Sequence, residues 1–437
     1  MTMLDGALRA NLTRLRKDRR GLTTISFAAG AVMVFGALAV ATDSGVWYAA
    51  RRGAQSAADS AAAAGAVTLA MRGAGQVQTV ARDVAARNGF AADASTTIEV
   101  NVPPTSGPNR ATPGAVEVIV RQTQSLGASG FFLSTPPTVR GRSVGILRSN
   151  ADVCVLALTG QLAFSGGANV STPGCMLASN RPADVGVTVS GGGSVEAYGI
   201  TTVGSCQNCS GSGISLTQPA AEWQVPASNP FAALDDKILP AFGNGTCIDP
   251  GNNPTSLLPY ERNGRRAYCK DIKLNANATL TLEPGTYYLH NASLVIQSGR
   301  VNCPTCTGGA GVTFVLTGDA SKVGGIDISA NAVVRLQAPT TAADPDYSGV
   351  LFYRDPRATN GLGGGNPAVR VNGGAQLSLA GGMYFPNADV RFNGNSSATG
   401  CSILVAAAIE FGGSATASQC SRTGTAVPQA RVVAFAN

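Results

Sequence analysis

The hydrophobic pattern of the chain begins with a long apolar run. Residues 21–42 supply 22 positions without a charge, and residues 1–20 before them hold six Arg or Lys against two Asp. A helix needs about 20 apolar residues to span a bilayer, so the run predicts a transmembrane helix rather than a core helix. Basic residues beside a span stay in the cytoplasm. The pattern therefore predicts a cytoplasmic tail at residues 1–20, with the rest of the chain outside.

A cleaved secretory signal is the alternative interpretation of this run. The apolar region of such a signal has about 7–15 residues and ends at a small-x-small cleavage site. The run here is longer, and Val40-Ala41-Thr42 is a poor cleavage site. The sequence also stays helical in character beyond Asp43. We therefore expect an anchor that is retained.

The helical pattern continues outside the expected membrane. Ala-rich sequence follows Asp43, and a second helical piece spans Val80 to Asn88, which predicts one long helix or a helix broken near residues 73–75. Its Ala and Gly faces would allow close packing against other helices. Alternating runs at 96–102 and 115–121 predict a hairpin with a long loop, and 139–146 a third strand. Residues 43–150 therefore predict one small α+β unit, a helix plus a β-hairpin.

From Asp152 onward the pattern changes to short alternating runs separated by Gly, Asn and Ser. Similar stretches begin at Val185, Ile272, Ile326 and Val369, and such self-similarity indicates stacked repeats. We expect an irregular right-handed parallel β-helix over residues 152–437, with a β-sandwich as the alternative. The repeats are interrupted from about Gln218 to Cys269. That Pro-rich segment predicts an ordered loop across the repeats, with a short helix at residues 231–239.

Composition and charge narrow the functional classes. The chain has 54 Gly among 437 residues and only 13% charged residues, which suits a turn-rich β architecture. The formal net charge is +7, and residues 1–20 carry +4 of it, so +3 remains for the other 417 residues. The basicity mostly reflects membrane topology. No basic run with interleaved aromatic residues follows residue 52, so nucleic acid is not an expected partner.

The cysteines all follow the apolar run. An even number on the outer side of a membrane indicates disulfides, although the sequence does not give their pairing. Two C-x-x-C pairs, Cys206/Cys209 and Cys303/Cys306, leave zinc or redox chemistry as alternatives, but 93 residues separate the pairs. We expect neither a metal nor another cofactor. The ten disulfide candidates are Cys154, Cys175, Cys206, Cys209, Cys247, Cys269, Cys303, Cys306, Cys401 and Cys420.

Candidate catalytic residues are few. His290 is the only histidine, which excludes sites that need two, and no G-x-S-x-G motif accompanies it. The charged candidates for cleaving a polysaccharide are Asp235, Asp236, Lys237, Arg354, Asp355 and Arg357. Arg354-Asp355-Pro356-Arg357 reads as a solvated loop after a strand. The sequence therefore predicts that the protein is not an enzyme.

The N-terminal residues resemble a known family. RRG at 19–21, the apolar run, Asp43 and RRGAQSAADSAAAAGA at 51–66 are similar to the N-terminal signature of TadE/TadG-like Flp (Tad, type IVc) pilus-assembly proteins. The VRGRSVGI stretch at 139–146 is similar to the TadG-type continuation. The resemblance marks a transmembrane or pilus-core helix at Gly21, Phe27, Val34, Phe35 and Asp43. It marks a signature block at Arg51, Arg52, Gln55, Ala57, Ala58 and Asp59.

This resemblance implies a TadG-like minor pilin or pilus-assembly protein of the bacterial inner membrane. Its implied partners are the membrane and other pilins or assembly components, and its β-domain would be displayed outside for structural or adhesive contact. The resemblance also implies a motif for processing: in prepilins that are cleaved, a Gly is followed five residues later by Glu. Here Ser26 stands at that distance from Gly21. The alternatives are a membrane-tethered β-helix that binds or cleaves polysaccharide, and a passive envelope scaffold.

Overall fold

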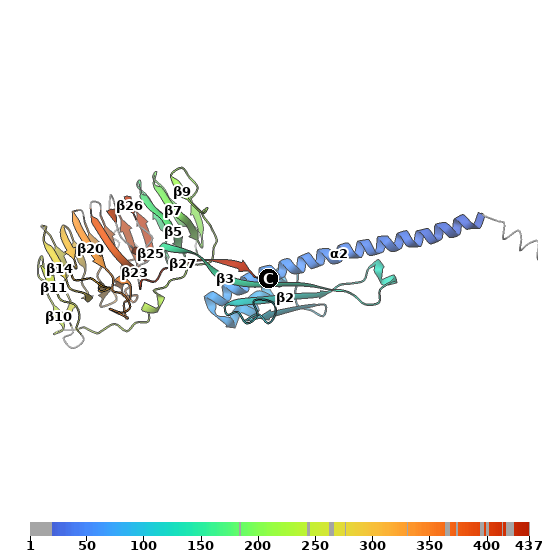
Figure 1. Cartoon of the computed structure of the whole chain (residues 1–437), viewed down its shortest axis with the longest axis horizontal. Coiled ribbons are helices and arrows are strands. Elements are labelled where there is room, and N and C mark those ends of the chain that lie inside the picture. The colour runs from blue at the N-terminus through green and yellow to red at the C-terminus, as the bar shows by residue number, and fades with distance from the viewer. Residues whose placement is uncertain are drawn as a thin grey trace, which may run out of the picture. The chain divides into compact units, whose positions relative to one another are not determined.

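The chain is mainly β with a long apolar helix at its N-terminus, as the pattern predicts (Figure 1). The chain divides into two compact units, the first Met1–Arg148 with Val433–Asn437 and the second Ser149–Val432. The computed structural model describes residues 20–182, 185–242, 245–261, 266–275, 277–329, 331–362, 368–372, 375–393, 397–398, 402–412, 414–416 and 424–436.

The helices of the first unit follow the predicted pattern. α2 spans Arg20–Arg72, the short η1 spans Ala74–Gln76, and α3 spans Val77–Arg87. Gly73 separates α2 from η1 with a φ of 74°, in the left-handed region that glycine enters without a steric penalty. The predicted break near residues 73–75 is therefore confirmed.

A three-stranded antiparallel sheet completes the first unit. β1 (Thr96–Asn101) pairs with β2 (Ala115–Thr123), which pairs with β3 (Thr138–Ala157), and η2 (Ala128–Phe131) lies in the loop between β2 and β3. These elements confirm the predicted hairpin and third strand. The end of β27 (Gln429–Phe435) belongs to this unit too, because the amide of Ala436 donates to the carbonyl of Val144.

The strands of the second unit pair in parallel and form three ladders. Ladder 1 contains β10 (Cys247–Ile248), β12 (Ala267–Tyr268), β15 (Gly285–His290), β18 (Val312–Thr317), β21 (Val350–Arg354), the middle of β23 (Gln376–Phe392), the start of β25 (Ser402–Phe411), and the ends of β3, β5 (Asn169–Ser179) and β7 (Ser194–Thr202). Ladder 2 contains β13 (Ile272–Leu274), β16 (Leu294–Ile296), β19 (Ile326–Ile328), β22 (Val369–Val371), the ends of β23 and β25, β4 (Leu162–Phe164), β6 (Val185–Val189) and β8 (Ser205–Gln207). Ladder 3 has two parts. The first part contains β11 (Ser256–Leu257), β14 (Thr279–Leu282), β17 (Gly299–Asn302), β20 (Ala332–Gln337), the start of β23, and β24 (Ser397–Ala398). The second part contains β26 (Ser414–Thr416), the starts of β5 and β7, and β9 (Ile214–Leu216).

The ladders confirm the internal repeat read from the sequence. All four similar stretches begin with a strand of ladder 2, namely β6, β13, β19 and β22. The strand that follows each of them belongs to ladder 3. Asn277 and Asn331 take positive φ values of 60° and 72° at the corners between these ladders. Asn tolerates that left-handed conformation better than most residues, which explains its recurrence there.

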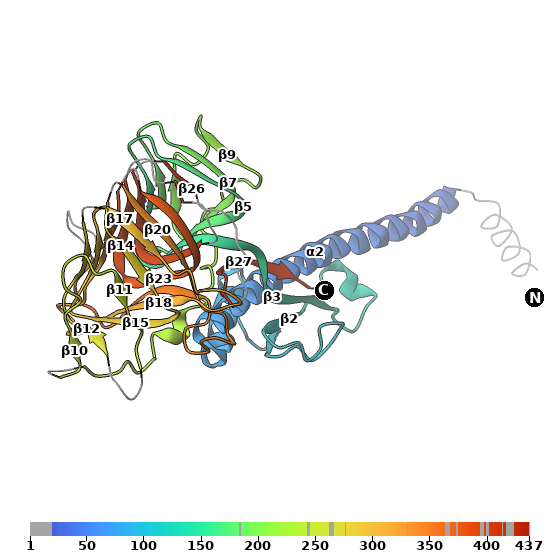
Figure 2. The same ribbon diagram turned by 60° about the vertical axis from the view of Figure 1, so that its left-hand side comes forward.

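The order of strands in ladder 1 differs from their order in the chain. β3 lies between β25 and β5, so the chain enters the second unit in the middle of the stack. It runs outward through β5 and β7 to β9, and it resumes at β10 on the other end (Figures 1 and 2). It then returns through β15, β18 and β21 to close against β3. Successive turns therefore stack in one direction throughout, although β3, the first strand of ladder 1 in the chain, lies next to β25, the last.

Residues 217–242, which we call the strap, connect these two ends and lie over the outer face of ladder 1. Phe231 packs on Tyr384, with ring centroids 5.5 Å apart, and Phe242 packs on Tyr288 at 5.3 Å. The predicted ordered loop is confirmed, but the predicted helix at 231–239 is reduced to η3 (Ala232–Leu234). Tyr353 donates its hydroxyl hydrogen to the Leu234 carbonyl, which a longer helix would use internally, and Pro240 has no amide to donate.

Alternation along ladder 1 gives the second unit its two apolar layers. Tyr287, Phe314 and Phe352 point inward, where their rings stack at 5.3 and 5.8 Å. The next residues along two of these strands, Tyr288 and Tyr353, point outward to the layer covered by the strap. Because side chains of a strand alternate between faces, each of these strands is buried on both sides. That burial explains the nearly continuous apolar runs of β18 and β21.

Candidate functional site

The first half of α2 exposes large apolar side chains. Phe27, Val34 and Phe35 are 79%, 59% and 70% exposed, and Gly21 lies in the first turn of the helix. Among the described residues, α2 is the one helix whose length and composition would allow it to cross a membrane. An apolar segment without a protein partner is compatible with single-pass anchoring in a bilayer.

Asp43 ends this exposed half and holds the loop between β2 and β3. Its Oδ2 accepts hydrogen bonds from the amides of Gly127 at 3.1 Å and Ser129 at 2.8 Å. Hydrogen bonding by Ser129, and after it by the Gly127 amide, lowers the pKa of the Asp43 carboxyl, so it is a carboxylate at neutral pH. Its partners are backbone amides of a loop distant in sequence.

The second half of α2 buries small residues against β3. Ala54, Ala58 and Ala62 have no exposed surface. A Cβ on Gly141 would lie 2.2 Å from the Ala54 carbonyl oxygen, and one on Gly145 would lie 2.4 Å from that of Ala62. Gly141 and Gly145 are four residues apart on the strand, and Ala54 and Ala62 are eight residues apart on the helix. Both separations span roughly 12–13 Å, so each glycine lies against one of the two alanines. Only glycine allows this approach.

The signature block contributes a polar contact to the same seam. The Gln55 side chain accepts from the amide of Arg142 at 3.1 Å and donates to its carbonyl at 2.8 Å. It also donates to Asp59 at 2.8 Å. Ala57 and Ala58 are buried beside it, whereas Arg51 and Arg52 are exposed. The block therefore attaches the unit's own sheet to α2, and its buried alanines pack within the first unit, against that sheet and the helix α3.

A buried carboxylate lies under the sheet, and the sequence reading missed it. Glu117 has no exposed side-chain surface and pairs with Arg142 at 2.7 Å. Burial opposes its ionisation, but hydrogen bonds from Ser106, Thr105, Asn101 and Arg142 outweigh burial and lower the pKa of Glu117 to about 2. Glu117 within the AVEVIVR run is the sequence signal for this network, but a charged residue at that position is equally typical of the exposed face of a strand.

Disulfides connect the cysteines of the second unit that the structure describes. They join Cys154 to Cys175, Cys206 to Cys209, Cys247 to Cys269, and Cys303 to Cys306. Each C-x-x-C pair thus closes on itself. Cys401 and Cys420 lie outside the described residues. Within the described part of the chain, no three His, Cys, Asp or Glu side chains are grouped to hold a metal ion.

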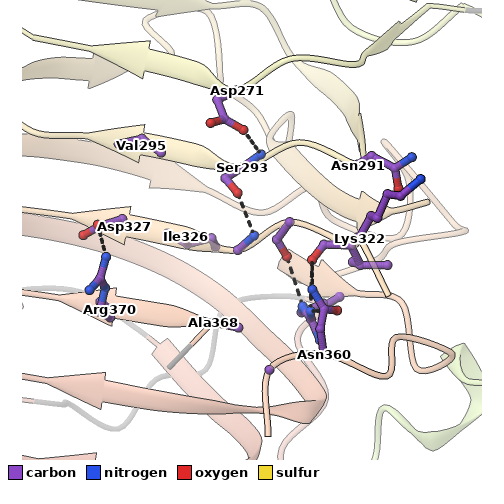
Figure 3. A pocket seen from close by; sticks show the side chains of 15 residues that line it. Asp271, Asn291, Ser293, Val295, Lys322, Ile326, Asp327, Asn360, Ala368 and Arg370 are labelled. Carbon is purple, nitrogen blue, oxygen red and sulfur yellow. Dashed lines mark hydrogen bonds and ion pairs between the residues drawn. The ribbon is translucent and has the colours of Figure 1, made fainter. Parts of the chain in front are cut away.

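A polar groove of about 500 Å³ lies beside ladder 2 (Figure 3). Asp271 accepts from the Ser293 amide at 2.9 Å, and the Ser293 hydroxyl accepts from the Gly325 amide at 3.1 Å, so a polar relay links successive repeats. Arg370 pairs with Asp327 at 2.6 Å on the neighbouring strands. The groove thus offers donors and acceptors whose positions are fixed by the stacking of the repeats.

Arg354 and Asp355 are buried, which corrects the interpretation of these two residues as part of a solvated loop, whereas Arg357 is exposed. Arg354 donates to the carbonyls of Gly324 and Val323 and to Asn360, and burial lowers its pKa to about 10, which leaves it protonated. Asp355 is 1% exposed and pairs with Arg357 at 2.6 Å. The Arg354 and Asp355 side chains are buried because ladder 1 continues to Arg354, and the carbonyls of Val323 and Gly324 face its guanidinium. Their partners give them a structural role.

Of the remaining candidates, Asp235 and Lys237 lie in the strap itself, and His290 lies beside it. Tyr384 donates to the Asp235 carboxylate at 2.9 Å, and burial raises the pKa of Asp235. Lys237 pairs with Asp346 at 2.9 Å. The ring of His290 lies 5.9 Å from that of Phe242. These contacts tie the strap to the repeats rather than assemble an acid and a base around an open site.

The segment that forms α2 is similar to a known protein family. Residues 21–71 match the family model described as putative Flp pilus-assembly TadE/G-like. The chain carries a TadE/G-like segment. This segment coincides with α2 almost to its last residue, Arg72, and so includes both the exposed apolar half and the half that holds the sheet. The match confirms the resemblance read from the residues. No curated protein and no solved structure matches the chain.

Proposed function

We propose that this chain is a TadG-like component of a Tad/Flp (type IVc) pilus, either a minor pilin or a pilus-assembly protein. Residues 21–42 would hold it in the bacterial inner membrane, with residues 1–20 in the cytoplasm and both folded units on the other side. The observation that carries the proposal is the family match at residues 21–71 over a helix with exposed large apolar residues. Ser26 in place of Glu favours a component that keeps its full anchor.

We further propose that the second unit is a right-handed parallel β-helix displayed for structural or adhesive contact, without catalysis. The parallel pairing in three ladders, one strand to each ladder in each repeat, supports this architecture. The β-sandwich alternative would require antiparallel sheets. The disulfides suit an oxidising compartment outside the cytoplasm. The buried Arg354 and Asp355 favour a structural role over acid–base chemistry.

The test is where the protein resides and where it begins. Pili are sheared from cells and separated from membranes, and both fractions are probed for the second unit, with mass spectrometry of the N-terminus. Intact protein in the membranes supports an anchored assembly component. Protein in sheared fibres that begins at Leu22 makes it a processed minor pilin. Protein in neither the pilus nor the membrane fraction would contradict the proposal.

A membrane-tethered polysaccharide-binding protein is the second candidate, and the polar groove favours it. Ser293, Asp327 and Arg370 line this groove, and such groups suit a ligand rich in hydroxyls. Binding of the purified chain to envelope polysaccharides tests this candidate. It requires that Arg370→Ala weakens binding while Arg335→Ala, on exposed surface of ladder 3, does not. Equal binding by both variants would remove the groove from consideration.

A further inference from the structure

The loop that joins β2 to β3 has an apolar tip. Residues 122–139 contain no charged side chain. At the tip, Phe131 is 90% exposed and Phe132 is 62% exposed. Two neighbouring exposed phenylalanines mark contact with a further apolar surface, since proteins rarely leave such groups together in water. The question is which surface covers them.

The tip lies beside the apolar half of α2. Residues of α2 between Ala31 and Thr42 line an open groove of about 490 Å³ together with Ala128, Phe131 and Phe132. Thr42 supplies the one hydroxyl among the lining residues, and it donates to the carbonyls of Leu38 and Ala39. The groove is therefore apolar on both walls. It is also continuous with the surface that anchors the chain.

The depth of the tip follows from its contact with α2. A ring carbon of Phe132 lies 3.5 Å from the position that a Cβ on Gly36 would take. Gly36 precedes Asp43 by seven residues, which is roughly 10 Å along a helix. Half the hydrocarbon core of a bilayer measures roughly 15 Å. With Asp43 at the membrane boundary, the phenylalanines therefore lie at the level of the acyl chains.

The backbone of the tip suits this environment. A bilayer core offers no water, so amide groups there need partners within the protein. The amides of Gly127 and Ser129 donate to Asp43. The amide of Gly130 donates to the Gly127 carbonyl, and those of Phe132 and Leu133 donate to the Ser129 carbonyl. The turn thus satisfies most of its donors, and its side chains beyond Ser129 are apolar.

We propose that residues 127–133 form a second membrane-inserted element, in which Phe131 and Phe132 contact the acyl chains of the leaflet nearest Asp43. Asp43 fixes this element to the span at the boundary. This inference rests on the proposed anchorage of α2 in the membrane. Its consequence is that the first unit is held to the membrane at two points, which restricts how its sheet moves relative to the bilayer.

The test measures the depth of single tryptophans in the full chain. Trp47 and Trp223 are replaced by Phe, and one tryptophan is introduced as Phe131→Trp, Phe35→Trp or Ile238→Trp. The chain is reconstituted in phosphatidylcholine vesicles with or without bromine on the acyl chains. Bromine quenches tryptophans that contact it. Position 35 reports the span itself, and position 238, which is 94% exposed in the second unit, is the aqueous control.

The proposal expects severalfold quenching at positions 35 and 131 and none at position 238. Quenching at position 35 without quenching at 131 would overturn the proposal while leaving the anchorage intact. A blue-shifted but unquenched tryptophan at 131 would mean that protein, such as a second pilin helix, covers the tip, which also overturns it. Absence of quenching at 35 would remove the anchorage and the inference together.

Discussion

The two halves of α2 use hydrophobic residues in opposite ways. In the first half, large side chains such as Phe27 and Phe35 are exposed, and no part of the unit's sheet covers them. In the second half, small side chains such as Ala54, Ala58 and Ala62 are fully buried under β3. Large residues provide contact area to a fluid partner such as lipid, whereas small residues allow a rigid backbone to approach closely.

Apolar sequence alone therefore does not specify whether a residue is buried. α2 is continuous through this change: Val46 and Tyr48, beyond Asp43, are still large and exposed, and the fully buried alanines begin at Ala54. The same helix can therefore anchor the chain and serve as the core of the first folded unit.

The largest effect is expected at the seam between α2 and β3. In Gly141→Ala, the new Cβ would lie 2.2 Å from the Ala54 carbonyl oxygen, so the helix or the strand must move. We expect a loss of about 3 kcal/mol or more of unfolding free energy in the first unit. Denaturant unfolding followed by Trp47 fluorescence measures it. The control is Gly45→Ala, where no atom lies within 4 Å of the new Cβ, and equal stability of the two variants would contradict this account.

The next effect is expected at the buried carboxylate. Glu117→Gln removes the charge that Arg142 and the surrounding donors hold. The shift of its pKa from 4.5 to about 2 corresponds to about 3 kcal/mol of stability, at 1.36 kcal/mol per unit.

Because the folded pKa is lowered, this contribution is fully present above pH 4.5 and is lost as the pH falls toward 2. Acid unfolding of the wild type and of Glu117→Gln should therefore converge over that range. Glu99→Gln, at an exposed pair with Arg121, is the matched control. Parallel pH profiles for the wild type and Glu117→Gln would refute the lowered pKa of Glu117 in the folded state.

A smaller effect is expected for the polar contact of the signature block. Gln55→Ala removes the bonds to the Arg142 amide and carbonyl, which leaves part of β3 without its partner on α2. We expect a loss of about 1–2 kcal/mol, because each neutral hydrogen bond contributes about 1 kcal/mol net. The same fluorescence experiment measures it. The exposed Ser56→Ala should be neutral, and a neutral Gln55→Ala would show that the bonds do not stabilise the seam.

The smallest effect is expected at the exposed arginines of the block. Arg52→Gln changes a side chain on the open face of α2, away from the sheet. We expect a change within about 0.5 kcal/mol in stability, as for most surface substitutions. A reduced yield of pili in cells with unchanged stability of the purified variant would assign Arg52 to contact with another assembly component. A large loss of stability would contradict its exposed position.

Much of the first unit was predictable because its signals are local. The uncharged run at 21–42, the glycines near 73 and the alternating runs at 96–102 and 115–121 each determine an element by pattern alone. The seam was not predictable in that way, although Gly141 and Gly145 share one face of a strand. Their significance depends on Ala54 and Ala62, which are more than 80 residues away in the chain.

In the second unit, the sequence gives the repeat but not its order in space. The similar stretches at Val185 and Ile272 follow one another in the sequence, yet they belong to opposite ends of the stack, because the chain enters in the middle at β3. Burial of Arg354 was missed for a related reason. Its partners Val323 and Gly324 lie about 30 residues earlier in the chain, and no local pattern predicts that these carbonyls face Arg354.

Leucine substitutions in the two halves of α2 test directly whether lipid contacts the first half while protein buries the second. Ala28→Leu with Ala37→Leu enlarges exposed positions of the first half, and Ala57→Leu with Ala61→Leu enlarges buried positions of the second. Unfolding of the first unit is measured on the full chain in lipid nanodiscs. We predict that the first pair leaves the midpoint unchanged, and that the second pair costs about 2–6 kcal/mol through overpacking. Equal effects from the two pairs would contradict the division of α2 between lipid and protein.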